Sequence, residues 1–84
     1  MPNGEKLLSI KISSMDQNIK LTITIKNTEY FSKVEQILYE KFPDLGTDYY
    51  FLVNGNKINR MQTLEQNKIK NDDILTLVTF YLFI

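Results

Sequence analysis

Two stretches near the start of the chain alternate strictly between apolar and polar residues. The apolar members are Leu8, Ile10 and Ile12 in the first stretch and Ile19, Leu21, Ile23 and Ile25 in the second. Because successive side chains of a strand point to opposite faces of a sheet, this period predicts two strands, each with one buried face and one face toward solvent. The mostly polar residues 14–18 between them make a loop of hairpin length.

The spacing of the apolar residues then changes to the period of a helix. Residues at three- and four-residue spacing form one stripe, with Ile37 and Leu45 beside it: Phe31, Val34, Leu38 and Phe42. We expect Asn27 or Thr28 to cap the start of this helix, with Glu29 in its first turn. Pro43 disfavours helical geometry at Phe42, so the helix should end near Lys41. A one-faced helix of about 12 residues is long enough to cover a single sheet.

The second half of the chain begins with a strand of aromatic and β-branched residues, Tyr49 to Val53. Asn54–Gly55 follows, a pair typical of tight hairpin turns because both central positions of the turn need a positive φ. We expect a short return strand around Lys57–Ile58. After a polar, irregular segment anchored by Leu64 and Ile69, the run from Ile74 to Phe80 predicts the last strand.

The order of these elements predicts an α+β fold with two layers: a mixed sheet of four or five strands with one helix packed across it, ββαββ. A right-handed crossover would place the last strand beside the first, which is a β-grasp topology. We expect a flexible leader at residues 1–6 and the domain at residues 7–80. Residues 81–84 are then an apolar extension of the last strand or a domain boundary.

The second half of the chain resembles ubiquitin, and the register needs no gap from Tyr49 to Val78. The similar segments are Phe51–Leu52–Val53–Asn54–Gly55–Asn56–Lys57–Ile58, Thr63–Leu64, Ile69 and Leu75–Thr76–Leu77–Val78. The likeness extends over roughly residues 8 to 80, with one extra residue in the first hairpin. The chain therefore looks like a member of the ubiquitin-like family, and the resemblance implies the ubiquitin-like β-grasp fold.

The segment after the last strand departs from the pattern of the family members that become attached to targets. Those members end in a thin diglycine tail, which the activating enzyme must thread into its site. Here the corresponding residues are Phe80–Tyr81–Leu82–Phe83–Ile84, and the last glycine is Gly55. We therefore expect a member that is not conjugated to other proteins.

The composition argues against several other classes of function. The chain has no Cys and no His, and its Asp and Glu residues are scattered, so we expect no enzyme, no metal site and no cofactor. Ten basic and ten acidic residues are interleaved, which does not suit nucleic acid. No apolar run at the start suggests a signal peptide, and no membrane role is expected. A cytoplasmic or nuclear location is the default.

One face of the sheet is the predicted binding surface. If Phe51, Val53, Leu75 and Leu77 point inward, alternation turns their neighbours outward: Tyr50, Leu52, Thr76, Val78 and Phe80. The resemblance places Leu52 and Val78 in the apolar patch that ubiquitin-like modules use for partners, with Thr76 at a histidine position and Met15 as an approximate counterpart of the hairpin-tip leucine. It also implies partners such as the proteasome or ubiquitin-binding domains. Several basic rim positions of ubiquitin are neutral here.

Two other functions remain open at this point. The chain could be an assembly module in which residues 78–84 of the apolar last strand pair with a second copy to form a homodimer. It could also be a β-grasp module of the kind that binds small GTPases, in which case Lys20 and Lys26 on the second strand would make the contacts.

Overall fold

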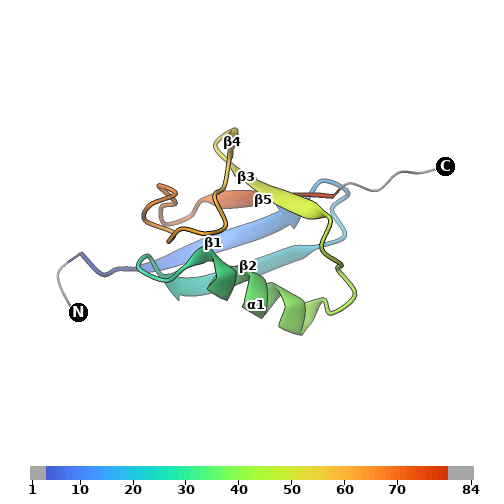
Figure 1. Ribbon diagram of the computed structural model, residues 1–84, viewed down its shortest axis with the longest axis horizontal. Helices are drawn as coiled ribbons and strands as arrows, with labels where there is room; N and C mark the ends of the chain where they lie inside the picture. Colours follow the sequence, from blue (N-terminus) through green and yellow to red (C-terminus); the bar gives the residue numbers. More distant parts are fainter. Residues whose placement is uncertain (1–3, 80–84) are drawn as a thin grey trace.

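The computed structural model describes residues 4–79, and within them one helix lies across one face of a five-stranded sheet (Figure 1). The elements follow in the order β1 (Leu7–Ser14), β2 (Lys20–Lys26), α1 (Phe31–Lys41), β3 (Tyr49–Val53), β4 (Asn56–Lys57) and β5 (Ile74–Thr79). The strand order in the sheet is β2-β1-β5-β3-β4, so β5 lies beside β1, as predicted from the crossover. These two strands are parallel and the other pairs are antiparallel. The expected α+β fold is confirmed.

The core lies between α1 and the sheet, and it follows the alternation seen in the sequence. The buried residues of the strands, the helix and the segment before β5 are Leu8, Ile10, Ile12, Ile23, Ile25, Phe31, Val34, Leu38, Tyr49, Phe51, Val53, Ile58, Leu64, Ile69, Leu75 and Leu77. At its centre the rings of Phe31 and Phe51 meet edge to face, with centroids 4.9 Å apart. The predicted anchors Leu64 and Ile69 are both buried, which explains how an irregular segment is held on a small domain.

The β3–β4 hairpin has the predicted turn. Asn54 has a φ of 51° and Gly55 a φ of 80°, so both central residues adopt the left-handed conformation that a tight hairpin requires. The return strand is short and begins one residue earlier than expected. Ile58, just after it, is buried and donates its amide to the carbonyl of Phe51 at 2.9 Å.

The start of the helix differs from the prediction. The residue before the first turn is Tyr30, whose side chain makes no capping hydrogen bond, and the first turn contains no acidic residue. The capping roles predicted for Asn27, Thr28 and Glu29 are therefore wrong. The amide of Phe31 donates instead to the carbonyl of Gln62 at 2.9 Å, so the segment before β5 supplies the cap.

Asn27 has another role, at the beginning of the described chain. Its side-chain carbonyl accepts the amide of Lys6 at 2.8 Å, and its side-chain amide donates to the carbonyl of Gly4 at 2.8 Å. Its own backbone amide donates to Lys6 at 2.9 Å, and Lys26 lies 3.3 Å from Glu5. These contacts hold residues 4–6 to the end of β2. Across the described part of the chain, the search for a helix of membrane-spanning length and hydropathy finds none.

Candidate functional site

Four of the predicted binding residues lie together on the face of the sheet that α1 does not cover. In the antiparallel pairing of β3 with β5, Tyr50 is opposite Val78 and Leu52 is opposite Thr76. All four are partly exposed, while their neighbours Phe51, Val53, Leu75 and Leu77 are buried. Side chains that are directly opposite in such a pair lie about 5 Å apart, so these four form one continuous surface.

The other two predicted residues are placed differently. The amide of Met15 donates to the carbonyl of Leu77 at 3.2 Å, so the backbone of Met15 lies next to β5 at the Val78 end. Met15 is 70% exposed. Phe80 lies outside the described residues.

The structure adds Ile74 to this surface. Ile74 is 57% exposed and lies on β5 at two- and four-residue spacing from Thr76 and Val78, hence on the same face. The alternation in the sequence would have identified it, had the strand been followed back to its first residue. We call the group Met15, Tyr50, Leu52, Ile74, Thr76 and Val78 the outward patch.

Lysines border the outward patch on two sides. Lys57 is paired with Leu52, and its ammonium lies 5.3 Å from the centre of the Tyr50 ring. Lys11 on β1 is paired with Ile74. By alternation, the residues of β1–β5 that share this face include Lys20 and Lys26 but no Asp or Glu. The strands of this chain with no net charge thus place lysines but no carboxylates on the outer face, which the residue counts alone do not reveal.

Lys20 and Lys26, the residues of the GTPase-binding alternative, lie at the two ends of the edge strand β2 and are exposed. Lys26 is already paired with Glu5. An ammonium that has a carboxylate partner is less available to an incoming acidic surface.

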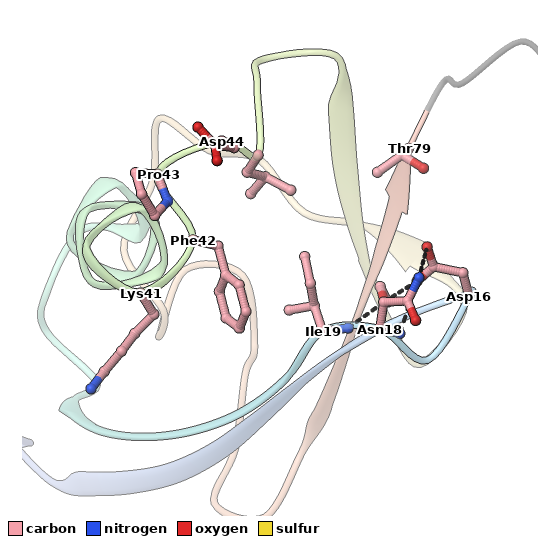
Figure 2. Close-up of a pocket in the computed structure, with 10 residues that line it drawn as sticks. Asp16, Asn18, Ile19, Lys41, Phe42, Pro43, Asp44 and Thr79 are labelled. Atoms are coloured by element: carbon pink, nitrogen blue, oxygen red, sulfur yellow. Dashed lines mark hydrogen bonds between the residues drawn. The ribbon is translucent and has the colours of Figure 1, made fainter.

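A pocket lies on the other side of the sheet, between the β1–β2 hairpin, the end of α1 and the end of β5 (Figure 2). Its volume is about 390 Å³, and its apolar lining comes from Ile19, Phe42 and Leu45. We call it the hairpin–helix pocket. Lys41, Pro43, Asp44 and Thr79 also line it.

The polar groups of the hairpin rim are bonded to one another. The hydroxyl of Ser14 donates to Asp16 at 2.5 Å and accepts the amide of Ile19 at 3.0 Å. Asn18 donates its backbone amide to one oxygen of Asp16 at 3.0 Å and its side-chain amide to the other at 3.1 Å. The hydrogen bond from Ser14, followed by that from the amide of Asn18, lowers the pKa of Asp16 from its ordinary value. The carboxylate is therefore part of the turn and is not poised as an acid.

A cluster of charged and polar side chains, separate from the outward patch and the hairpin–helix pocket, joins α1 to β3. Glu35 accepts two hydrogen bonds from the guanidinium of Arg60, one of them from Nε at 2.9 Å, and a third from the hydroxyl of Tyr49 at 2.6 Å. The guanidinium carbon lies 4.7 Å from the centre of the Tyr49 ring. The two charged groups of the cluster, Glu35 and Arg60, are bonded to each other, which is typical of an ion pair with a structural role. Within residues 4–79 no group of three Asp or Glu side chains could hold a metal ion.

Solved structures resemble this chain over almost its whole length. One is a designed protein described as based on ubiquitin, with a TM-score of 0.75 and 23% identity, matching 96% of this chain and 95% of its own. Another is the solution structure of a ubiquitin-like domain from an Arabidopsis thaliana protein, with a TM-score of 0.77 and 9% identity, matching 92% of this chain and 81% of its own. The chain has the ubiquitin-like β-grasp fold.

Proteins with the ubiquitin-like fold are generally not enzymes, but the fold alone does not determine the function of a protein that has it. In all, 286 chains of known structure match, and one fold commonly hosts many unrelated functions. The sequence matches no protein-family model and no curated protein. A function for this chain must therefore be argued from its own surface.

Proposed function

We propose that this ubiquitin-like domain is a non-enzymatic protein-interaction module, not conjugated to targets, that binds a protein partner through the outward patch around Leu52 and Val78. The observation that carries the proposal is the pairing of Tyr50 with Val78 and of Leu52 with Thr76, all partly exposed on the uncovered face. Contiguous exposed apolar groups of this kind usually mark a site of interaction.

The position of the patch in the sheet favours this role. It lies on β3 and β5, and β5 is hydrogen-bonded to strands on both of its sides. The buried residues Phe51, Leu75 and Leu77 fix the backbone from below, so the outward side chains are presented by a rigid support. Less freedom is then lost when a partner binds.

The chemistry of the border indicates what the partner should offer. An apolar surface would cover Leu52 and Val78, and carboxylates at its edge would meet Lys57 and Lys11. Ubiquitin-binding domains and proteasomal receptors are the partners that the fold suggests, and a cytoplasmic or nuclear location belongs to the same proposal. The absence of conjugation is proposed because bulky apolar residues, Phe80–Tyr81–Leu82–Phe83–Ile84, directly follow β5 in place of a thin glycine tail.

An NMR titration of the whole chain with a panel of isolated ubiquitin-binding domains and proteasomal ubiquitin receptors tests the proposal. We expect at least one member to shift the amides of Leu52, Thr76 and Val78. Leu52→Ala should weaken that interaction by about tenfold or more, since a central interface side chain contributes at least about 1.4 kcal/mol.

The matched control is Thr24→Ala, an exposed residue on the same face but on the far strand β2. It should leave the affinity unchanged. Shifts confined to Lys20–Lys26, or equal losses for both variants, would contradict the assignment of the binding face. If no member of the panel binds, the proposed link to the ubiquitin–proteasome system is wrong.

A further inference from the structure

We propose that a groove on the outer face of β1 and β2 binds a phosphorylated serine or threonine side chain of a protein partner, and that Lys11 and Lys20 hold the phosphate. The groove has a volume of about 420 Å³, and its lining includes Lys11, Ser13, Gln17, Lys20, Thr22 and Ile74. We call it the β1–β2 groove. It shares only Ile74 with the outward patch, and it adds a second ligand to this face without depending on the partner proposed above.

The register between β1 and β2 brings two ammonium groups and two hydroxyls together. Lys11 is paired with Thr22, and Ser13 is paired with Lys20. Residues that are opposite each other in two strands point to the same face, as do alternate residues along one strand. Lys11 and Lys20 are therefore diagonal neighbours, with their Cα atoms roughly 7–8 Å apart. Their long side chains can reach one anion between them.

These four side chains have no partner elsewhere in the described chain. Within residues 4–79, the ammonium groups of Lys11 and Lys20 form no ion pair, and the hydroxyls of Ser13 and Thr22 form no hydrogen bond to another protein group. Lys26, at the other end of β2, is by contrast paired with Glu5 at 3.3 Å.

The carboxylates closest in sequence do not compensate the two lysines. Asp16 in the hairpin accepts the hydroxyl of Ser14, and Asp73 before β5 accepts the amide of Lys70 at 2.8 Å. An anion in the β1–β2 groove would therefore meet hydrogen-bond donors with a positive charge that is not neutralised nearby.

The kind of donor in the groove favours a phosphate over a carboxylate. A planar carboxylate is matched best by the forked guanidinium of an arginine. The only arginine of the chain, Arg60, is bonded to Glu35. Ammonium groups and hydroxyls are single donors that approach from several directions, which suits the three terminal oxygens of a phosphate that carries nearly two negative charges at neutral pH.

The border of the groove favours a phosphate carried by a polypeptide. Ile74, which is paired with Lys11, lines the groove from β5 and is 57% exposed. The residues next to a phosphorylated side chain can cover Ile74, whereas free phosphate leaves it in water. Anionic membranes are typically recognised by clusters of roughly four to eight basic residues, and this groove holds two. A phosphorylated protein segment is therefore the favoured occupant.

The first test is an NMR titration of the complete 84-residue chain with a short synthetic peptide that carries one phosphoserine between leucines. We expect saturable shifts of the amides of Lys11, Ser13, Lys20 and Thr22, with a Kd of about 1 mM or tighter. Binding should strengthen between about pH 5 and pH 7, because the phosphate acquires its second charge there.

Three control ligands show whether the phosphate and the peptide both contribute. The same peptide with serine in place of phosphoserine should cause no shifts, and the version with glutamate should bind clearly more weakly. Inorganic phosphate should also bind more weakly than the phosphopeptide. If the phosphopeptide causes no shifts in the groove, or if glutamate or inorganic phosphate binds equally well, the inference is wrong.

The second test compares two substitutions that each remove one positive charge from the same face of β2. Lys20→Gln should weaken binding of the phosphopeptide by roughly threefold to tenfold, the range for an exposed charged contact. Lys26→Gln, the matched control outside the groove, should weaken it by less than about twofold. Equal losses would mean that only the net charge matters, and would overturn the inference.

Sedimentation with vesicles that contain phosphatidylinositol phosphates tests the membrane as an alternative source of phosphate. We expect no binding of the complete chain. Binding to the vesicles that Lys20→Gln abolishes and Lys26→Gln preserves would assign the groove to a lipid headgroup, and the proposed protein segment would then be wrong.

Discussion

Glu35 holds together three parts of the chain that are far apart in sequence. From the buried side of α1 it accepts hydrogen bonds from Arg60, which follows β4, and from Tyr49, the first residue of β3. A half-buried carboxylate that bonds a bidentate guanidinium and a phenol is well satisfied, whereas losing any one of these partners leaves polar atoms without a hydrogen bond. The cluster therefore holds the start of β3 against α1, and its role is structural and not catalytic.

Tyr49→Phe isolates the hydroxyl of this cluster. The change should lower the free energy of unfolding by about 1.5 kcal/mol at neutral pH, because a hydrogen bond to a charged group is lost while the ring remains. Burial, followed by the hydrogen bond to Glu35, raises the pKa of Tyr49 above its ordinary value. Stability that depends on the protonated phenol is complete below about pH 10 and is lost as the pH rises further. The gap between wild type and Tyr49→Phe should thus narrow above that pH.

Urea unfolding at neutral pH and in alkaline buffer measures both effects. Tyr30→Phe is the matched control because Tyr30 is 59% exposed and its side chain does not cap the helix. It should be neutral at both pH values. A gap that widens with rising pH would mean that Tyr49 does not stay protonated in the folded state.

The β3–β4 hairpin is an element that depends on its turn. β4 contains only two residues, and both are exposed. Gly55 has a φ of 80°, and a Cβ added there would meet nothing within 4 Å. The cost of Gly55→Ala therefore comes from the backbone alone, about 1 to 2 kcal/mol for a left-handed residue with a side chain. Asn56→Ala, the next residue, should cost clearly less. Thermal unfolding of the two variants checks this, and equal losses would show that the turn conformation is not limiting.

Some elements of this fold are encoded by nearby residues, and others depend on partners far along the chain. Strands and the tight turn depend on local period and on φ, so alternation and Asn54–Gly55 were enough to place them. The start of the helix depends on the carbonyl of Gln62, and Asn27 is occupied by Gly4 and Lys6. Such long-range partners leave no local signal, and the capping rules therefore failed.

The same distinction holds for the candidate site. The inward and outward sides of β3 and β5 followed from alternation, because burial with a period of two is a local property. That Lys57 lies over Tyr50 and that Lys11 lies beside Ile74 follows from the register between strands. Register is set by the turn, the crossover and the whole sheet together. The basic border of the patch could therefore be read only from the structure.

At the scale of the whole molecule, α1 covers one face of the sheet, and no other helix or strand of residues 4–79 covers the opposite face (Figure 1). Neighbouring residues of a strand are then in different surroundings, one in the core and one at the surface. Under the proposed function, this division gives stability to one face and partner binding to the other. The fold can keep its core intact while the outward residues change, which suits a module whose partner is selected by its surface.

Leu75 and Ile74 test this division on a single strand. Leu75 is fully buried, and Ile74, its neighbour, is 57% exposed on the uncovered face. Leu75→Ala should lower the free energy of unfolding by about 2–5 kcal/mol, since it removes apolar area and leaves a cavity. Ile74→Ala should cost less than about 1 kcal/mol, from the lower β propensity of alanine and little else. Guanidinium denaturation followed by circular dichroism measures both, and Leu75→Val serves if Leu75→Ala does not fold. Comparable losses at the two positions would mean that the outward face contributes to stability as much as the core does. In that case it would be covered in the native protein by something other than a transient partner.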